Sequence, residues 1–381
     1  MSTTPDAEGL ALVLTGGGAR AAYQAGLLSW LARNYPELRI PILTGISAGA
    51  MNAASLAQHH GSFPQAVAEL VALWSELMPE RVFRVDIRWL ARNVGRWGAG
   101  LLSGGARGDP RVRGLLDTAP LHELLHESLA PVDGELTGID YNLQRGTLQA
   151  VALSATSYTT GQSVVWAQGR RIGGWERPNR RGVQTRLQVD HIMASAALPL
   201  LFPAVRVGEE WYGDGGMRQT APLSPALHLG ARKLLAISTR YDRSRAEAER
   251  PSITGYPPPA QILGVLYNAI FLDLIDQDVL RLERLNRLVE KLPEEEREGM
   301  RVVRLLVLRP SCDLGVLARD YEPRLPRAFR FLTRGLGTRQ TRSADLLSLM
   351  MFQGDYLQRL VAMGEADAEA RAEEIEAFLS V

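Results

Sequence analysis

The sequence predicts an α/β protein built around a parallel sheet. Residues 10–15 form an apolar run of strand length, followed by three glycines and a helical pattern that extends to about residue 33. Residues 40–44 form a second apolar run, followed again by glycine and then by a helical pattern over residues 48–59. Two successive strand, turn and helix units imply right-handed crossovers between neighbouring parallel strands.

The rest of the chain continues this pattern with two interruptions. Further strands are predicted at residues 148–155, 163–168, 233–238 and 302–308. Residues 79–146 are rich in arginine, glycine and tryptophan, and we expect a lid-like insertion over the carboxyl ends of the strands. Residues 240–259 end in three prolines and predict a loop. Residues 261–291 have a helical apolar stripe suited to packing, and the alanine- and glutamate-rich residues from 365 onward predict a solvated helix.

Composition excludes several classes of protein. The 43 basic and 42 acidic residues leave a net charge of +1, so no general attraction for nucleic acid is expected. Lys233 and Lys291 are the only lysines and neither follows a glycine loop, which excludes a P-loop ATPase. Cys312 is the only cysteine, residues 1–9 lack a signal-peptide pattern, and no run approaches the roughly 18 apolar residues that span a bilayer. We expect a cytoplasmic protein; the sequence leaves its oligomeric state open.

The segment from Gly45 to Gly49 matches the G-x-S-x-G pattern of a serine nucleophile. It lies between a predicted strand and a predicted helix, which is where this pattern requires a sharp turn. Glycine on both sides permits such a turn, and the Ser47 hydroxyl is then exposed at the amino end of the helix. The pattern predicts Ser47 as a nucleophile.

The three glycines Gly16, Gly17 and Gly18 predict a loop of exposed backbone N–H groups at the start of a helix. Such a loop suits an oxyanion or a phosphate. Gly16, Gly18 and Ala21 also fit a dinucleotide fingerprint, which requires an acidic residue at the end of the next strand. Glu37 precedes that strand instead. A purely structural turn is the remaining alternative.

A nucleophilic serine needs a base, and the histidines are poorly placed to provide one. A hydrolase triad carries its histidine after the acid in chain order. Of six histidines only His228 lies late in the chain, inside a predicted helix. Asp214, in a glycine-flanked turn, could act directly on Ser47 if burial raises its pKa. The Asp-Gly dipeptide is also an ordinary turn signal.

Four segments, taken together and in order, resemble the bacterial patatin-like phospholipases. They are Gly16 to Arg20, Gly45 to Gly49, residues 194–199 and Asp214 to Gly216. The similarity covers residues 9–228, and residues 309–315 and 346–356 are also similar to segments of related bacterial proteins. The one departure is Ala21, where the glycine loop of the family often ends in glycine.

This resemblance implies a three-layer α/β/α sandwich over residues 9–228, with residues 229–381 as a mostly helical extension packed on it. It implies hydrolysis of lipid carboxylic esters by a Ser47–Asp214 dyad, without a histidine, a metal or another cofactor. The N–H groups of Gly17, Gly18 and Ala48 would hold the oxyanion, and Arg20 would either add charge there or orient the loop. The accompanying motif glycines are Gly16, Gly45, Gly49, Gly215 and Gly216.

Two other functions are compatible with the sequence. His122, Glu123 and His126 match the H-E-x-x-H zinc pattern, but a catalytic zinc needs a third protein ligand and the sequence supplies no G-x-x-H continuation or obvious helical glutamate. Leucines at helical spacing also make residues 117–129 an ordinary packing helix. The second alternative is a lipid-binding or scaffold protein that carries the motifs without turnover. Head group and acyl-chain length are not defined by the motifs.

Residues 81–97 show an amphipathic helical pattern. The hypothesis is a membrane-facing helix beside the site, giving peripheral contact with lipid phosphates. An ordinary packing helix with a solvated basic face is the alternative. The apolar stripe is Phe83, Ile87, Leu90, Val94 and Trp97, and the basic flank is Arg81, Arg84, Arg88, Arg92 and Arg96.

Overall fold

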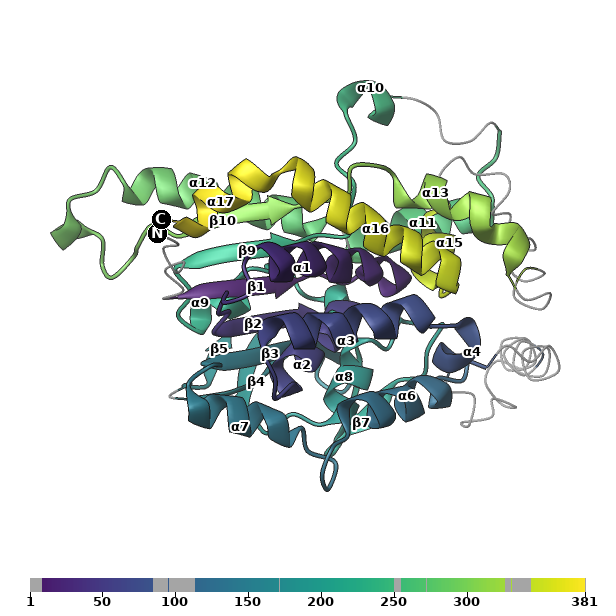
Figure 1. Ribbon diagram of the computed structural model, residues 1–381, viewed down its shortest axis with the longest axis horizontal. Helices are drawn as coiled ribbons and strands as arrows, with labels where there is room; N and C mark the ends of the chain where they lie inside the picture. Colours follow the sequence, from purple (N-terminus) through teal and green to yellow (C-terminus); the bar gives the residue numbers. More distant parts are fainter. Residues whose placement is uncertain are drawn as a thin grey trace.

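A computed structural model describes residues 9–84, 95, 114–170, 172–249, 255–271, 273–325, 330 and 344–380. Its centre is a sheet that contains ten strands in this part of the chain (Figure 1). The strands are β1 (Leu10–Leu14), β2 (Ile42–Ile46), β3 (Ala150–Ser157), β4 (Ser163–Gly169), β5 (Trp175–Arg177), β6 (Arg180–Gln184), β7 (Val205–Val207), β8 (Glu210–Asp214), β9 (Lys233–Ile237) and β10 (Arg304–Leu308).

The sheet order is β10-β9-β1-β2-β3-β4-β6-β5, with β8 paired to β3 and β7 to β8. The five strands from β10 to β3 are parallel, as the crossover argument predicts. Strands β4 and β8 both run antiparallel to β3, so the complete sheet is mixed. The six strands predicted from the sequence correspond to β1, β2, β3, β4, β9 and β10, which confirms an α/β fold with a mainly parallel sheet.

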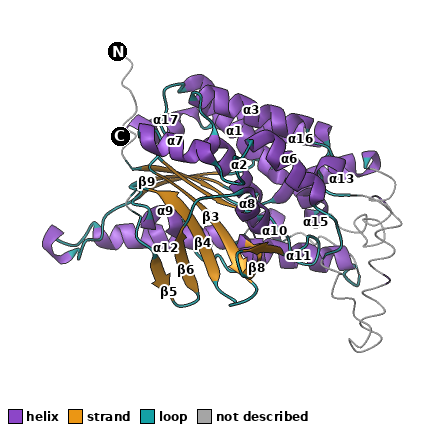
Figure 2. Ribbon diagram, turned by 90° about the horizontal axis from the view of Figure 1, so that it is seen from below, coloured by secondary structure: helices purple, strands orange, loops and turns teal. Residues whose placement is uncertain are grey.

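Helices cover both faces of this sheet (Figure 2). On the first face lie α1 (Ala22–Asn34), α2 (Ala48–Gln58), α3 (Phe63–Glu76) and α16 (Gly354–Ala370), and on the second lie α9 (Ser224–His228) and α12 (Leu274–Val289). The remaining helices are α4 (Pro79–Val82), α6 (Ala119–Leu129), α7 (Thr137–Arg145), α8 (Val189–Ser195), α10 (Arg245–Ala248), α11 (Pro259–Phe271), α13 (Leu314–Tyr321), α15 (Asp345–Met350) and α17 (Ala372–Ser380).

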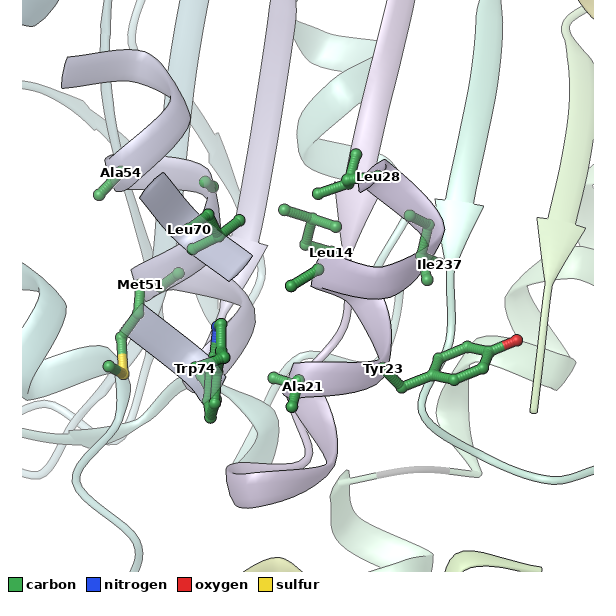
Figure 3. Packing of buried hydrophobic residues seen from close by; sticks show 14 of the residues in the cluster. Leu14, Ala21, Tyr23, Leu28, Met51, Ala54, Leu70, Trp74 and Ile237 are labelled. Carbon is green, nitrogen blue, oxygen red and sulfur yellow. The ribbon is translucent and has the colours of Figure 1, made fainter. Parts of the chain in front are cut away.

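Strand β1 shows why both faces must be covered. Its side chains alternate between two separate apolar clusters: Leu12 and Leu14 face the first, while Ala11 and Val13 face the second. A central strand buried on both sides reads as a continuous apolar run, which is the pattern of residues 10–14. Figure 3 shows Leu14 in the first cluster, together with Leu28 of α1 and Trp74 of α3. This confirms the three-layer α/β/α sandwich.

The helix expected after residue 365 is present as the end of α16 and as α17, but one face of it is buried on the core rather than solvated. Helix α16 packs along α1, and α17 buries Ile375 and Phe378. The two helices α1 and α16 touch at glycines: a Cβ at Gly26 would lie 2.0 Å from the carbonyl oxygen of Val361, and one at Gly364 would lie 2.2 Å from that of Tyr23. The solvated part of the prediction was incomplete, because a few residues among the alanines and glutamates, Ala368, Ile375, Phe378 and Leu379, form a buried face.

The sequence predicts residues 229–381 as a mostly helical extension packed on the sandwich. Strands β9 and β10 lie in this range, and β9 pairs with β1 at the centre of the sheet, so the range also contributes to the sandwich itself. The helical pattern over 261–291 forms two helices, α11 and α12. Most of the expected amphipathic segment 81–97 lies outside the described residues, as does part of the expected insertion 79–146. None of the described helices is both long and apolar enough to cross a membrane.

Candidate active site

Ser47 lies in the tight turn between β2 and α2, as its motif predicts. Its φ of 55° is in the left-handed region, which a non-glycine residue occupies at a cost of about 1–3 kcal/mol. The flanking glycines are required by close packing. A Cβ at Gly45 would lie 2.4 Å from the carbonyl oxygen of Gly49, and one at Gly49 would lie 2.3 Å from that of Leu14. The turn therefore holds a buried serine at the carboxyl end of a central parallel strand, where α/β proteins place their sites.

Asp214 ends strand β8 and is fully buried. Its Oδ1 accepts a hydrogen bond of 2.9 Å from the N–H of Gly216. The neighbouring Gly215 allows the turn to lie against β3, because a Cβ there would be 2.1 Å from the carbonyl oxygen of Ser154. Burial raises the pKa of Asp214 from 3.8 to about 7, and hydrogen bonds from Ser47 and Gly216 oppose this rise. A carboxylate with this pKa can act as a base near neutral pH.

The side chains of Ser47 and Asp214 face each other. The Ser47 hydroxyl is close enough to lower the pKa of Asp214 as a hydrogen-bond donor. The buried Oδ2 of Asp214 nevertheless has no hydrogen bond of standard geometry. The contact is therefore longer or less well aligned than a standard hydrogen bond, and such catalytic contacts often tighten only when substrate is bound.

The glycine loop passes directly in front of Ser47. A Cβ at Gly16 would lie 3.1 Å from the Cβ of Ser47, and one at Gly17 would lie 2.3 Å from Oγ1 of Thr239. Thr239 in turn donates a 2.5 Å hydrogen bond to the carbonyl oxygen of Gly16. In the part of the chain that the structure describes, no acceptor is bonded to the N–H groups of Gly17, Gly18 or Ala48. The loop and the start of α2 therefore offer free N–H donors near the serine.

Arg20 is buried and its side chain is directed to α15. Its Nε donates to Oγ of Ser348 at 2.7 Å, and Nη2 lies 2.8 Å from Oδ1 of Asp345. The backbone approaches α15 as well, because a Cβ at Gly18 would lie 2.2 Å from the carbonyl oxygen of Leu349. Of the two roles that the sequence left open for Arg20, these contacts favour orientation of the loop over direct contact with an oxyanion.

The histidines lie apart from the dyad. All six are in the described part of the chain, and none forms a hydrogen bond with Ser47 or Asp214. His228 stacks on Trp175 with 4.8 Å between ring centroids, and His191 packs against Trp166. His122 and His126 project from α6 with their rings 4.5 Å apart. Among the described residues no group of three or more His, Cys, Asp or Glu side chains could hold a metal ion.

The cavity beside the dyad is small. It measures about 20 Å³ and is bounded by the glycine loop, by Gly216 and by Ile270 and Phe271 of α11. A cavity of this volume holds roughly one water molecule. A larger cavity of about 480 Å³ lies at the opposite end of the sheet, before β2 and after α2. We assign the site to the end of the sheet that holds the smaller cavity, because Gly16 and Gly216 line that cavity and lie against Ser47 and Asp214 respectively.

A serine turn and a glycine loop with free N–H groups at the carboxyl ends of central parallel strands form an arrangement suited to a serine acyl hydrolase. The family model of the patatin-like phospholipases matches residues 12–227, and the chain is a member of that family. The match shows membership in the family and does not test the resemblance to its bacterial members in particular. No curated protein sequence matches the chain.

The solved structures that match the chain share little sequence with it. VipD from Legionella pneumophila is 13% identical with a TM-score of 0.33, and the match covers 93% of this chain and 67% of VipD. Human GIVD cytosolic phospholipase A2 is 12% identical with a TM-score of 0.47, and the match covers 99% of this chain. The chain spans 62% of the length of that human protein.

Proposed function

We propose that the protein hydrolyses lipid carboxylic esters, in the manner of a phospholipase A or lysophospholipase, with Ser47 as nucleophile and Asp214 as base. Membership in the patatin-like phospholipase family supports the reaction class. The observation that carries the assignment is the buried carboxylate of Asp214, which faces the Ser47 hydroxyl and has its pKa raised to about 7.

The reaction proceeds in two halves. Asp214 accepts the proton of Ser47 as the serine oxygen attacks the ester carbonyl, and the N–H groups of Gly17, Gly18 and Ala48 stabilise the oxyanion. The intermediate collapses to an acyl-enzyme while protonated Asp214 returns the proton to the leaving alcohol. Asp214 then accepts a proton from water as the water oxygen attacks the acyl carbon, and it returns that proton to the Ser47 oxygen as the bond between Ser47 and the fatty acid breaks.

A serine-directed fluorophosphonate tests the nucleophile. Wild-type protein should be labelled stoichiometrically at Ser47, and Ser47→Ala should remain unlabelled. Ser55→Ala is a matched control, because Ser55 lies on the same helix and its hydroxyl bonds only the carbonyl of Met51. Labelling that persists in Ser47→Ala would contradict the proposal.

Product analysis tests the substrate class. Incubation with a mixed lipid extract followed by mass spectrometry should show free fatty acids with wild type and none above background with Ser47→Ala. A folded wild-type protein that binds lipid vesicles but releases no fatty acid would favour the non-catalytic lipid-binding alternative.

A further inference from the structure

We propose that Ser195 is a positioning residue for the nucleophile, and that the turn after α8 sets the spacing between Ser47 and Asp214. The inference rests on the proposed function. Ser195 is the last residue of α8 and is fully buried. Its Oγ accepts a 3.0 Å hydrogen bond from the N–H of Ser47 and donates one of 2.6 Å to the carbonyl oxygen of Ser154 in β3.

The same turn also holds the base. Two residues after Ser195, the carbonyl oxygen of Ala197 accepts a 2.9 Å hydrogen bond from the N–H of Asp214. The main chains of the nucleophile and of the base are therefore attached to one short segment, residues 195–197. Strand β3 supports this arrangement from behind, since Thr156 donates a 2.8 Å hydrogen bond to the carbonyl oxygen of Asp214. Movement of this segment would change the separation of the two reacting side chains.

The main chain of Ser47 needs such an attachment. Its left-handed conformation is strained and persists only where surrounding contacts determine it. Its N–H is buried and requires an acceptor. A hydroxyl is suited to this position because it accepts from one group and donates to another at once, which a carboxylate or an alanine cannot do. Because the N–H of Ser47 is engaged with Ser195, the oxyanion donors are those of Gly17, Gly18 and Ala48.

Ser195→Ala removes both hydrogen bonds and leaves a buried donor and a buried acceptor unpaired. The turn at Ser47 should relax, and a displacement of about 1 Å at a reacting atom lowers the rate by about 100-fold. We expect kcat on a soluble ester to fall 10- to 100-fold. KM should stay within about twofold, because Ser195 is fully buried and its hydroxyl bonds main-chain groups of Ser47 and Ser154 rather than a surface that substrate could contact.

The control is Ser163→Ala. Ser163 is equally buried, on β4, and its hydroxyl bonds Oε1 of Gln219 rather than either member of the dyad. Ser195→Ala loses two buried hydrogen bonds and Ser163→Ala loses one, so both melting temperatures should fall, more so in Ser195→Ala, while only Ser195→Ala loses kcat. Ser195→Thr retains the hydroxyl and should recover most of the lost rate. Equal kcat values in Ser195→Ala and Ser163→Ala, each corrected for the folded fraction, would overturn the inference.

The pH profile gives a second readout. The Ser47 hydroxyl lowers the pKa of Asp214, so a displaced serine should move the acid limb of the kcat profile to higher pH. The other titratable groups that act with Asp214 are Tyr158 and Tyr267, whose pKa values burial raises, and they stay neutral in this range. If the acid limb of Ser195→Ala lay at the same pH as that of wild type, this would contradict the positioning role.

The variant Ser47→Ala separates the two proposals. If Ser47→Ala retained activity, the proposed function itself would fail. If Ser47→Ala were inactive and Ser195→Ala fully active, only the positioning role of Ser195 would be refuted.

Discussion

The buried carboxylate of Asp214 should make the protein less stable at the pH where it is active. Burial raises the pKa of Asp214 from 3.8 to about 7, so the folded chain holds this proton more tightly than the unfolded chain does. Between the two pKa values the folded state carries more protons, and the free energy of unfolding therefore falls as pH rises. Each unit of pKa corresponds to about 1.36 kcal/mol, so ionised Asp214 costs the fold about 4 kcal/mol.

Asp214→Asn removes this cost along with the base. We expect the variant to lose hydrolysis by several orders of magnitude and to unfold less readily than wild type at alkaline pH. The free energy of unfolding of Asp214→Asn minus that of wild type should be about 3 kcal/mol larger at pH 8.5 than at pH 5. The reason is that wild-type Asp214 is protonated at the lower pH and ionised at the higher.

Urea denaturation followed by circular dichroism, at constant ionic strength, measures this difference at both pH values. Asp133→Asn is the control, because Asp133 is exposed and its replacement should give the same difference from wild type at pH 5 and pH 8.5. If the difference between Asp214→Asn and wild type were also independent of pH, the carboxyl of Asp214 would not be destabilised by burial and the reasoning would be wrong.

Hydrolysis of a soluble ester should rise with pH around a midpoint near 7, because only ionised Asp214 can accept a proton; a flat profile from pH 5 to 8 would exclude this base. Gly18→Ala should slow fluorophosphonate labelling about 100-fold, since a Cβ there would lie 2.2 Å from the carbonyl oxygen of Leu349 and displace an oxyanion donor. Asp345→Asn should lower the free energy of unfolding in urea by about 3 kcal/mol, because buried Arg20 loses its charged partner; an unchanged value would show that the pair is dispensable. Phe271→Ala should accelerate labelling by a bulky fluorophosphonate more than by a small one, and equal acceleration would show that Phe271 does not restrict access.

Local sequence pattern predicted the turns that carry the proposed site residues, whose catalytic roles stay predictions. The turn at Ser47 and the glycine loop each consist of residues close in sequence, where strand pattern and turn residues agree. Asp214 was predicted from its own turn. The partners that hold them are distant along the chain: Ser47 meets Ser195 across 148 residues, and Arg20 meets Ser348 across 328. No local periodicity reports such contacts, although residues 194–199 stood out by family resemblance.

The strands and helices also differ in how far local sequence determines them. Strands β1, β2 and β9 are fully buried and read as apolar runs, so the sequence predicted them. Strands β5 and β6 are short and polar and none of their residues is fully buried, so their pairing depends on neighbours rather than on their own pattern. The buried face at the end of α16 and in α17 was not predicted, because alanine in a helix is compatible both with solvent and with packing against a core.

The attachment of the glycine loop to α15 has a consequence for how activity arises during synthesis. Residues 16–20 leave the ribosome early, whereas Asp345, Ser348 and Leu349 follow more than 300 residues later. At about 5–20 residues per second, the ribosome takes at least about 15 seconds to make the intervening chain. Until α15 is released, Arg20 has no partner and the loop has no support behind Gly18. If Ser47 is the nucleophile, as we propose, a nascent chain should carry it well before the glycine loop is held in place.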